Sequence, residues 1–179
     1  PRVRFETSQG EFTVELFADS APSTVAHFLK LVEQGFYEDC DFFQVTDHIL
    51  ALTGDPAGVG TGNAGVWLRD EHEREGAREA FRGALIMAKI PLGEGKFVPN
   101  SASSQFAITF LPLPAVSETQ TVFGRVIDGM EIVSRLRRVD PNKEKEKGEI
   151  VVPPDLILSA EITRPPAQPL PDPIYVERP

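Results

Sequence analysis

The stretch 121–133 has the sequence TVFGRVIDGMEIV and holds both kinds of element that we expect in this chain. Residues 121–126 form a brief apolar run, which predicts a short strand. Residues 130–136 follow Gly129 and predict a short helix, with arginines near its C-terminal end, where cations are favourable to the helix dipole. The stretch therefore predicts a strand followed at once by a helix.

The N-terminal part of the chain shows the same two patterns at greater length. Apolar and polar residues alternate on both sides of Ser8-Gln9-Gly10, so residues 3–16 predict a β-hairpin. A helix should begin at Pro22 and end near Gly35, with Ser20 helping to cap it. Its core-facing stripe consists of Val25, Phe28, Leu29 and Val32.

Beyond residue 37 the pattern changes to short strands separated by turn residues. We expect these strands at residues 42–45, 49–53, 83–88, 106–109, 121–126 and 156–163. Many short strands together with two helices predict a mainly β fold, a barrel with helical lids.

Composition and charge argue against nucleic-acid binding and against a membrane-spanning segment. The chain has 179 residues, enough for one domain whose core needs neither a metal nor a disulfide. Its 27 acidic and 18 basic side chains give a net charge of −9, which argues against nucleic-acid binding because phosphate contacts need a basic surface. No apolar run is long enough to span a membrane. We expect a monomer that binds neither nucleic acid nor membrane.

The ends of the chain and its cysteine bear on domains and location. Cys40 is the only cysteine, which is compatible with the cytoplasm, but the chain begins at Pro1 without a methionine, so export stays open. Residues 1–164 form the expected domain. Residues 165–179 carry six prolines and predict an extended or disordered tail or linker. Residues 141–149, with the run KEKEKGE, predict a solvated charged loop.

Several segments in a fixed order give the clearest indication of a family. They are APSTVAHFLKLVEQGFY, FFQV, TGDP followed by GTG, GALIMA, SSQFAIT and TVFGRVIDGMEIV. In this order they resemble the cyclophilin family of peptidyl-prolyl cis-trans isomerases, over about residues 3–163. The resemblance implies a closed eight-stranded β-barrel with two capping α-helices. It also implies a groove on the outer face that binds proline-containing peptides, without a cofactor or a metal.

The resemblance implies that the segment FFQV carries the catalytic position, and there the chain departs from the family. Gln44 stands where family members have an arginine that donates to the prolyl nitrogen. A neutral amide gives a hydrogen bond about half as strong as a charged donor does. Loss of one such electrostatic donor typically lowers a rate by ~10²–10³. The alternative is that Gln44 is a polar strand residue facing solvent.

Most other groove positions are also changed. The resemblance implies substrate contacts by Ile49, Leu50, Leu52, Ala88, Lys89, Gln105, Ala107, Ala115, Val116 and Gln120. Of these, only Ala88 and Gln105 match the family. Leu52 replaces a glutamine that binds the substrate backbone, and Ala107 replaces the phenylalanine at the floor of the proline pocket. Lys89 replaces an asparagine and either offers a cation to the groove or is a solvated surface lysine.

Two functions therefore remain open. In the first, the domain binds proline-containing peptides or a protein partner, and its isomerase activity is weak or lost because Gln44 replaces the arginine. In the second, it is an active peptidyl-prolyl cis-trans isomerase that uses Gln44 or Lys89 as the donor.

Overall fold

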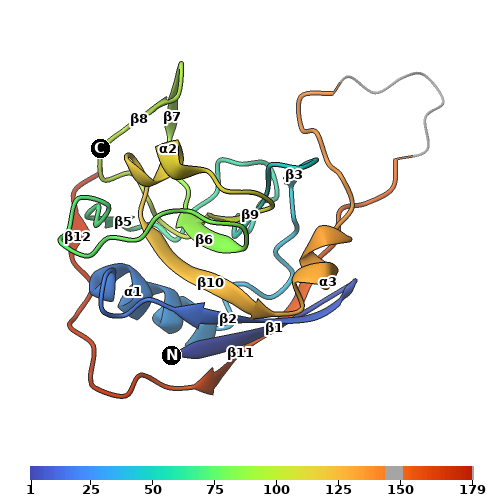
Figure 1. Ribbon diagram of the computed structural model, residues 1–179. Helices are drawn as coiled ribbons and strands as arrows, with labels where there is room; N and C mark the ends of the chain where they lie inside the picture. Colours follow the sequence, from blue (N-terminus) through green and yellow to red (C-terminus); the bar gives the residue numbers. More distant parts are fainter. Residues whose placement is uncertain (144–150, 179) are drawn as a thin grey trace.

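The computed structural model describes residues 1–143 and 151–178, and its centre is a curled antiparallel sheet with the strand order β11-β1-β2-β10-β6-β9-β4-β3 (Figure 1). Its strands are β1 (Arg2–Thr7), β2 (Gly10–Leu16), β3 (Gln44–Thr46), β4 (Leu50–Thr53), β6 (Ala84–Met87), β9 (Phe106–Thr109), β10 (Val122–Asp128) and β11 (Ile157–Arg164). The mainly β fold and every strand expected from the sequence are confirmed, with ends displaced by a few residues.

The curled sheet is open between its two edge strands. Among the described residues, no strand ladder joins β3 to β11. The segments just before these strands approach each other through an isolated bridge between Asp41 and Leu156. The architecture is thus a half-barrel, and complete closure of the barrel stays a prediction.

Three helices accompany the sheet: α1 (Pro22–Glu33), α2 (Pro114–Ser117) and α3 (Met130–Ser134). Both expected helices are present, whereas α2, a single turn that begins at the second proline of a Pro-Leu-Pro sequence, was not expected. Capping of α1 by Ser20 is wrong. The N–H groups of Ser23 and Thr24 instead donate to the carboxylate of Glu71, at 3.2 and 2.8 Å. A carboxylate satisfies the free N–H groups of a first turn and is favourable to the helix dipole, so a distant loop performs the capping.

A cluster of aromatic rings fills the space between α1 and the concave face of the sheet. Phe28 on α1 lies 5.0 Å from Phe123 and 5.4 Å from Phe106 between ring centroids. Phe5 and Phe12 stack at 5.0 Å across the first hairpin. All five side chains are buried. Because each ring buries a large apolar area, this cluster holds α1 against β1, β2, β9 and β10.

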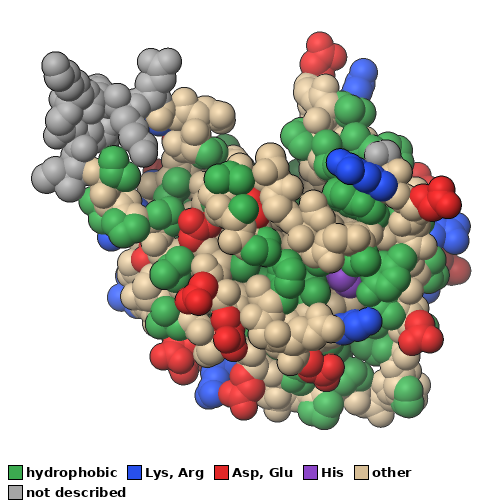
Figure 2. Space-filling view, turned by 180° about the vertical axis from the view of Figure 1, so that it is seen from behind, with side chains coloured by type: hydrophobic (Ala, Val, Ile, Leu, Met, Phe, Trp, Pro, Cys, Tyr) green, Lys and Arg blue, Asp and Glu red, His purple; other side chains and the backbone are tan. Residues whose placement is uncertain are grey.

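Two small sheets lie outside the main one, and neither was expected. Strand β5 (Trp67–Leu68) pairs with β12 (Tyr175–Val176), and β7 (Pro91–Gly93) pairs with β8 (Lys96–Phe97). The β7–β8 hairpin stands out from the surface, and its tip carries an acidic and a basic side chain (Figure 2).

The end of the Pro-rich tail lies against the domain. The Ile174 N–H donates to Ser23 Oγ at 2.8 Å, and the Tyr175 hydroxyl lies 3.1 Å from His27 Nδ1. Backbone pairing with β5 and the contact with the buried His27 thus hold residues 174–176 against the domain, and the extended or disordered tail over residues 165–179 stays a prediction. The expected domain boundary at residue 164 stays a prediction.

Most of the expected charged loop lies outside the described residues. The charged loop was expected at 141–149, of which residues 144–149 are outside the described part of the chain. Within the described part, no helix has the length and apolar character needed to cross a membrane.

The buried His27 predicts that stability falls in mild acid. Burial, and to a lesser degree the nearby Lys30 charge, lower the pKa of His27 below its usual value, although a hydrogen bond to the Ser103 carbonyl opposes this. The unfolded chain then takes up the proton first as the pH falls, so acid favours unfolding below about pH 6.5. We expect the free energy of unfolding, measured with urea, to decrease from about pH 7.5 to about pH 5.5. His27→Gln should flatten this dependence; an equally steep dependence in the variant would contradict it.

Candidate functional site

A row of side chains crosses the outer face of the sheet. Gln44 on β3 lies opposite Leu52 on β4, and Leu52 lies opposite Ala107 on β9. Ala107 in turn lies opposite Ile86 on β6, which lies opposite Val122 on β10. Side chains of directly opposed residues project to the same face of a sheet. Register alone therefore brings Gln44, Leu52 and Ala107 together.

The two ends of this row differ in their surroundings. Ile86 and Val122 are 1% and 4% exposed, because Phe17, Leu113 and Val116 pack over them in a small apolar cluster. Gln44 and Leu52, at the other end, are only half-buried. The row is thus filled at one end and accessible at the end that carries the amide of Gln44.

The side-chain amide of Gln44 is the polar group at the accessible end of the row. No hydrogen bond joins the Gln44 side chain to another described residue. One guanidinium approaches this strand, because an isolated bridge pairs Val45 with Val139, the neighbour of Arg138. Arg138 donates from Nε to Asp47 at 2.9 Å and from Nη1 to the Ser134 carbonyl at 3.1 Å. The local cation is therefore held by other acceptors, and the amide is the free polar group of the row.

Gln105, the residue before β9, is fixed by the loop that follows β4. Its Nε2 donates to the Gly62 carbonyl at 2.8 Å, and its own carbonyl accepts from the Ala88 N–H at 3.0 Å. Both retained family positions, Ala88 and Gln105, thus lie side by side at one border of the row.

The loop after β4 explains the glycines of the TGDP and GTG motifs. Burial alone raises the pKa of Asp55, but N–H groups of Ala57, Gly62, Val59 and Gly60 offset it and bring the pKa below its usual value. A Cβ on Gly62 would come within 1.8 Å of Asp55 Oδ1, and one on Gly54, where φ is +85°, within 2.5 Å of the Ser104 carbonyl. These glycines let the loop close around the Asp55 carboxylate, and the loop in turn holds Gln105.

The remaining expected residues lie around the row at different depths. Leu50 is opposite Thr109, two positions along β4 from Leu52, and so shares the outer face. Ile49 lies in the turn before β4 and is 42% exposed. Ala115 is exposed on α2, Val116 packs on Ile86, and Gln120 is 8% exposed. The structure therefore brings Gln44, Leu50, Leu52 and Ala107 onto one face and leaves Ile49 and Ala115 at its margins.

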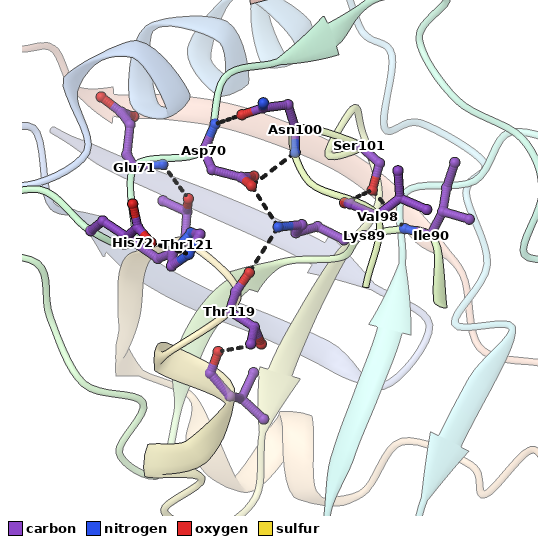
Figure 3. A network of polar contacts seen from close by, with 12 residues as sticks. Asp70, Glu71, His72, Lys89, Ile90, Val98, Asn100, Ser101, Thr119 and Thr121 are labelled. Atoms are coloured by element: carbon purple, nitrogen blue, oxygen red, sulfur yellow. Dashed lines mark hydrogen bonds and ion pairs between the residues drawn. The ribbon is translucent and has the colours of Figure 1, made fainter. Parts of the chain in front are cut away.

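Lys89 does not offer its charge to this row. Its side chain is 4% exposed, and its Nζ lies 2.5 Å from Asp70 Oδ2 and 2.9 Å from the Thr119 carbonyl (Figure 3). The interpretation of Lys89 as a solvated surface lysine is wrong, because the ammonium is buried and paired. Its geometry also gives no support to Lys89 as a donor in the groove.

The Asp70 carboxylate connects Lys89 to the base of the β7–β8 hairpin. Asp70 Oδ2 also accepts from the Asn100 N–H at 2.8 Å, and the Asn100 side chain accepts from the Asp70 N–H at 2.8 Å. The Ile90 N–H donates to Ser101 Oγ at 2.9 Å at the same base (Figure 3). The residue pair Asp70 and Lys89 thus sets where the hairpin leaves the domain.

Sequence reasoning missed several residues around the site. Ile86 and Val122 were not expected there because the segment GALIMA and the start of β10 are buried on both faces and have no alternation to show which face each residue takes. Asp70 and Asn100 were missed because their contacts join loops, where no periodic pattern exists. Among the described residues, no group of three His, Cys, Asp or Glu side chains is placed to hold a metal ion.

Comparison with known proteins identifies the relatives of this chain. The model of the family described as cyclophilin type peptidyl-prolyl cis-trans isomerase/CLD matches residues 2–162. The peptidyl-prolyl cis-trans isomerase-like 1 of Aspergillus fumigatus is 35% identical over 144 residues, covering 79% of this chain and 85% of the relative. A peptidyl-prolyl cis-trans isomerase of Arabidopsis thaliana is 36% identical over 142 residues, covering 78% and 82%.

Solved structures show the same architecture. The Cryptosporidium parvum cyclophilin type peptidyl-prolyl cis-trans isomerase, determined in the presence of the dipeptide Ala-Pro, superposes with a TM-score of 0.73 at 28% identity. The match covers 92% of this chain and all of that one. A cyclophilin from Hirschia baltica has a TM-score of 0.71 at 19% identity, over 89% and 73% of the two chains, and shows the likeness of fold.

The buried ion pair of Lys89 and Asp70 predicts that a single variant loses more free energy of unfolding than a variant that removes both charges. Lys89→Met should lower the free energy of unfolding by about 3–5 kcal/mol, because it leaves the Asp70 carboxylate buried without its cation. Lys89→Met combined with Asp70→Asn should regain a substantial part of that loss, since no unpaired charge remains. Urea unfolding measures both.

A matched exposed pair provides the control for this prediction. Arg4 and Glu161 lie 2.6 Å apart, with side chains 46% and 64% exposed. Arg4→Met should therefore cost only ~0.2–1 kcal/mol. Equal effects of Lys89→Met and Arg4→Met would contradict the importance given to the buried pair.

Proposed function

Because the chain belongs to the cyclophilin-type peptidyl-prolyl cis-trans isomerase family, we propose that it binds proline-containing peptide segments on the outer face of its sheet and isomerises them weakly or not at all. The observation that carries this proposal is the row in which the unpaired amide of Gln44 lies beside Leu52 and Ala107. The row supplies an apolar surface and one neutral hydrogen-bonding group.

The reaction itself makes a charged donor valuable. The X–Pro bond has partial double-bond character, and its rotation faces a barrier of ~18–20 kcal/mol. In the twisted state the prolyl nitrogen becomes pyramidal and gains a lone pair, so a donor aimed at this nitrogen lowers the barrier by binding the transition state more tightly than the ground state. No covalent step, cofactor or metal is needed.

Gln44 can donate to that nitrogen only with a neutral N–H. A charge-assisted hydrogen bond is about twice as strong as a neutral one, and removal of one preorganised donor typically lowers a rate by ~10²–10³. No second cation replaces it in the arrangement described: Lys89 is paired with Asp70, and Arg138 with Asp47. This supports a weak or lost activity over the alternative of an active isomerase that uses Gln44 or Lys89.

The surface next to Gln44 favours binding of an apolar ring but offers it only a small contact area. Ala107 is small and Leu52 and Ile86 are aliphatic, so the row offers methyl groups where an aromatic floor would give a larger contact area. A proline ring can rest on such a surface, and the amides of Gln44 and Gln105 flank it. We expect binding of moderate affinity to a peptide or to an extended segment of a protein partner, with the chain itself acting as a monomer.

Restoring the charge tests the proposal. We expect the wild-type protein to have a kcat/KM at least ~10²-fold below that of the Cryptosporidium parvum enzyme on the same Ala-Pro peptide. Gln44→Arg should raise kcat/KM at least tenfold, while Gln44→Met, which has similar length and no donor, should not raise it. A wild-type efficiency within tenfold of that enzyme, or equal values for the Arg and Met variants, would contradict the role given to Gln44.

A further inference from the structure

A second concave surface lies immediately beside the row. It is a cleft of about 690 Å³ whose lining includes Arg69, Arg74, Lys89, Phe97, Thr119 and Ile174. Two residues that line the cleft, Lys89 and Thr119, are the chain neighbours of Ala88 and Gln120.

The acids of the cleft are mostly committed to partners within the protein. Asp70 is neutralised by Lys89 and holds the Asn100 N–H (Figure 3). Glu71 is 5% exposed and accepts from the N–H groups of Ser23 and Thr24 and from the Thr24 hydroxyl. Neither carboxylate is available to an incoming group.

The third acid of the cleft, Glu73, is largely exposed to solvent. The side chain of Glu73 is 89% exposed, and its carboxylate lies 4.0 Å from His72 Nε2. It is therefore a solvated charge at the rim, where screening by water and salt is strong.

The arginines of the cleft are less satisfied than its acids. No ion pair or side-chain hydrogen bond joins Arg69 to another described residue. Arg74 has one long contact, 3.9 Å from its Nε to Glu71, whose oxygens already accept three hydrogen bonds. The cleft thus presents two guanidinium groups that can still take a carboxylate, and a guanidinium matches a carboxylate in a bidentate geometry.

Apolar side chains complete the walls. Phe97 and Pro99 come from the β7–β8 hairpin and its base, and Ile174 comes from the docked tail. They exclude water from one side of the cleft, which strengthens a charge contact made beside them.

We propose that this cleft binds an acidic residue, Asp or Glu, that flanks the proline of the bound segment, with Arg69 and Arg74 as the residues that determine this specificity. The inference rests on the proposed function, since it gives the class of peptide that the groove accepts. A net charge of −9 opposes acidic peptides elsewhere on the molecule, so the preference must come from this local pair of arginines.

The test uses a series of Ala-Pro peptides that carry one glutamate, moved one residue at a time along both sides of the proline, each compared with its glutamine counterpart. For wild-type protein at fixed ionic strength, we expect one position at which glutamate lowers Kd by about threefold to tenfold. Arg69→Gln combined with Arg74→Gln should abolish this difference between the glutamate peptide and its glutamine counterpart. Arg82→Gln removes one positive charge from a different surface cleft, lined by Met130 and Ser134, and should keep the difference.

The outcomes separate this inference from the proposed function. The glutamine peptides could bind with no preference for glutamate at any position, or the preference could be lost equally in Arg82→Gln. Either result contradicts the proposed specificity of the cleft and leaves the proposed binding of proline in the groove intact. If no Ala-Pro peptide binds, the proposed function fails, and the glutamate peptide with alanine in place of proline then examines the cleft alone. If this proline-free peptide binds the wild-type protein, its binding must be lost in the variant that combines Arg69→Gln with Arg74→Gln. If it does not bind the wild-type protein, the proposed role of the cleft is contradicted as well.

Discussion

The antiparallel register of β3, β4, β9 and β6 is the constraint on which the candidate site depends. Because side chains alternate between the two faces of a strand, a slip of one residue would send Gln44 into the core and bring Val45 outward. The core side of the same strands fixes this register, since Ala51, Ile108 and Leu85 form a parallel row that is fully buried. The aromatic cluster beneath them therefore determines, at a distance, which side chains face outward from the row.

Electrostatics decides which polar groups remain available at the surface. Lys89 and Arg138 lie near the groove, but each is held by a carboxylate and by backbone carbonyls. A buried lysine must be paired, because the cost of desolvating an unpaired ammonium exceeds what any single neutral contact returns. In the neighbouring cleft, the carboxylates of Asp70 and Glu71 are bound by Lys89 and by N–H groups of α1, so its arginines keep charges that these acids do not neutralise.

The sequence predicts the parts of the fold that have local patterns. Alternation along β1 and β2 and the stripe of Val25 and Phe28 on α1 were sufficient for these elements, and the apolar run at residues 42–45 was sufficient to predict a strand that includes Gln44. The paired role of Lys89 could not be predicted, because its partner Asp70 lies 19 residues away in a loop without periodicity. The docked tail was missed for a related reason: β5 and β12 are two residues long, and so short a strand leaves no alternation to detect.

The central claim, that the groove binds proline while its neutral amide leaves turnover slow, is tested most directly by NMR on one sample. An Ala-Pro peptide is titrated into labelled protein while exchange between its cis and trans forms is followed. The account predicts shifts in the side-chain amide signals of Gln44 and Gln105, with peptide exchange staying close to the spontaneous time of tens to hundreds of seconds. Exchange accelerated to many events per second by a trace of the protein, or no shift at Gln44 at saturating peptide, would contradict it.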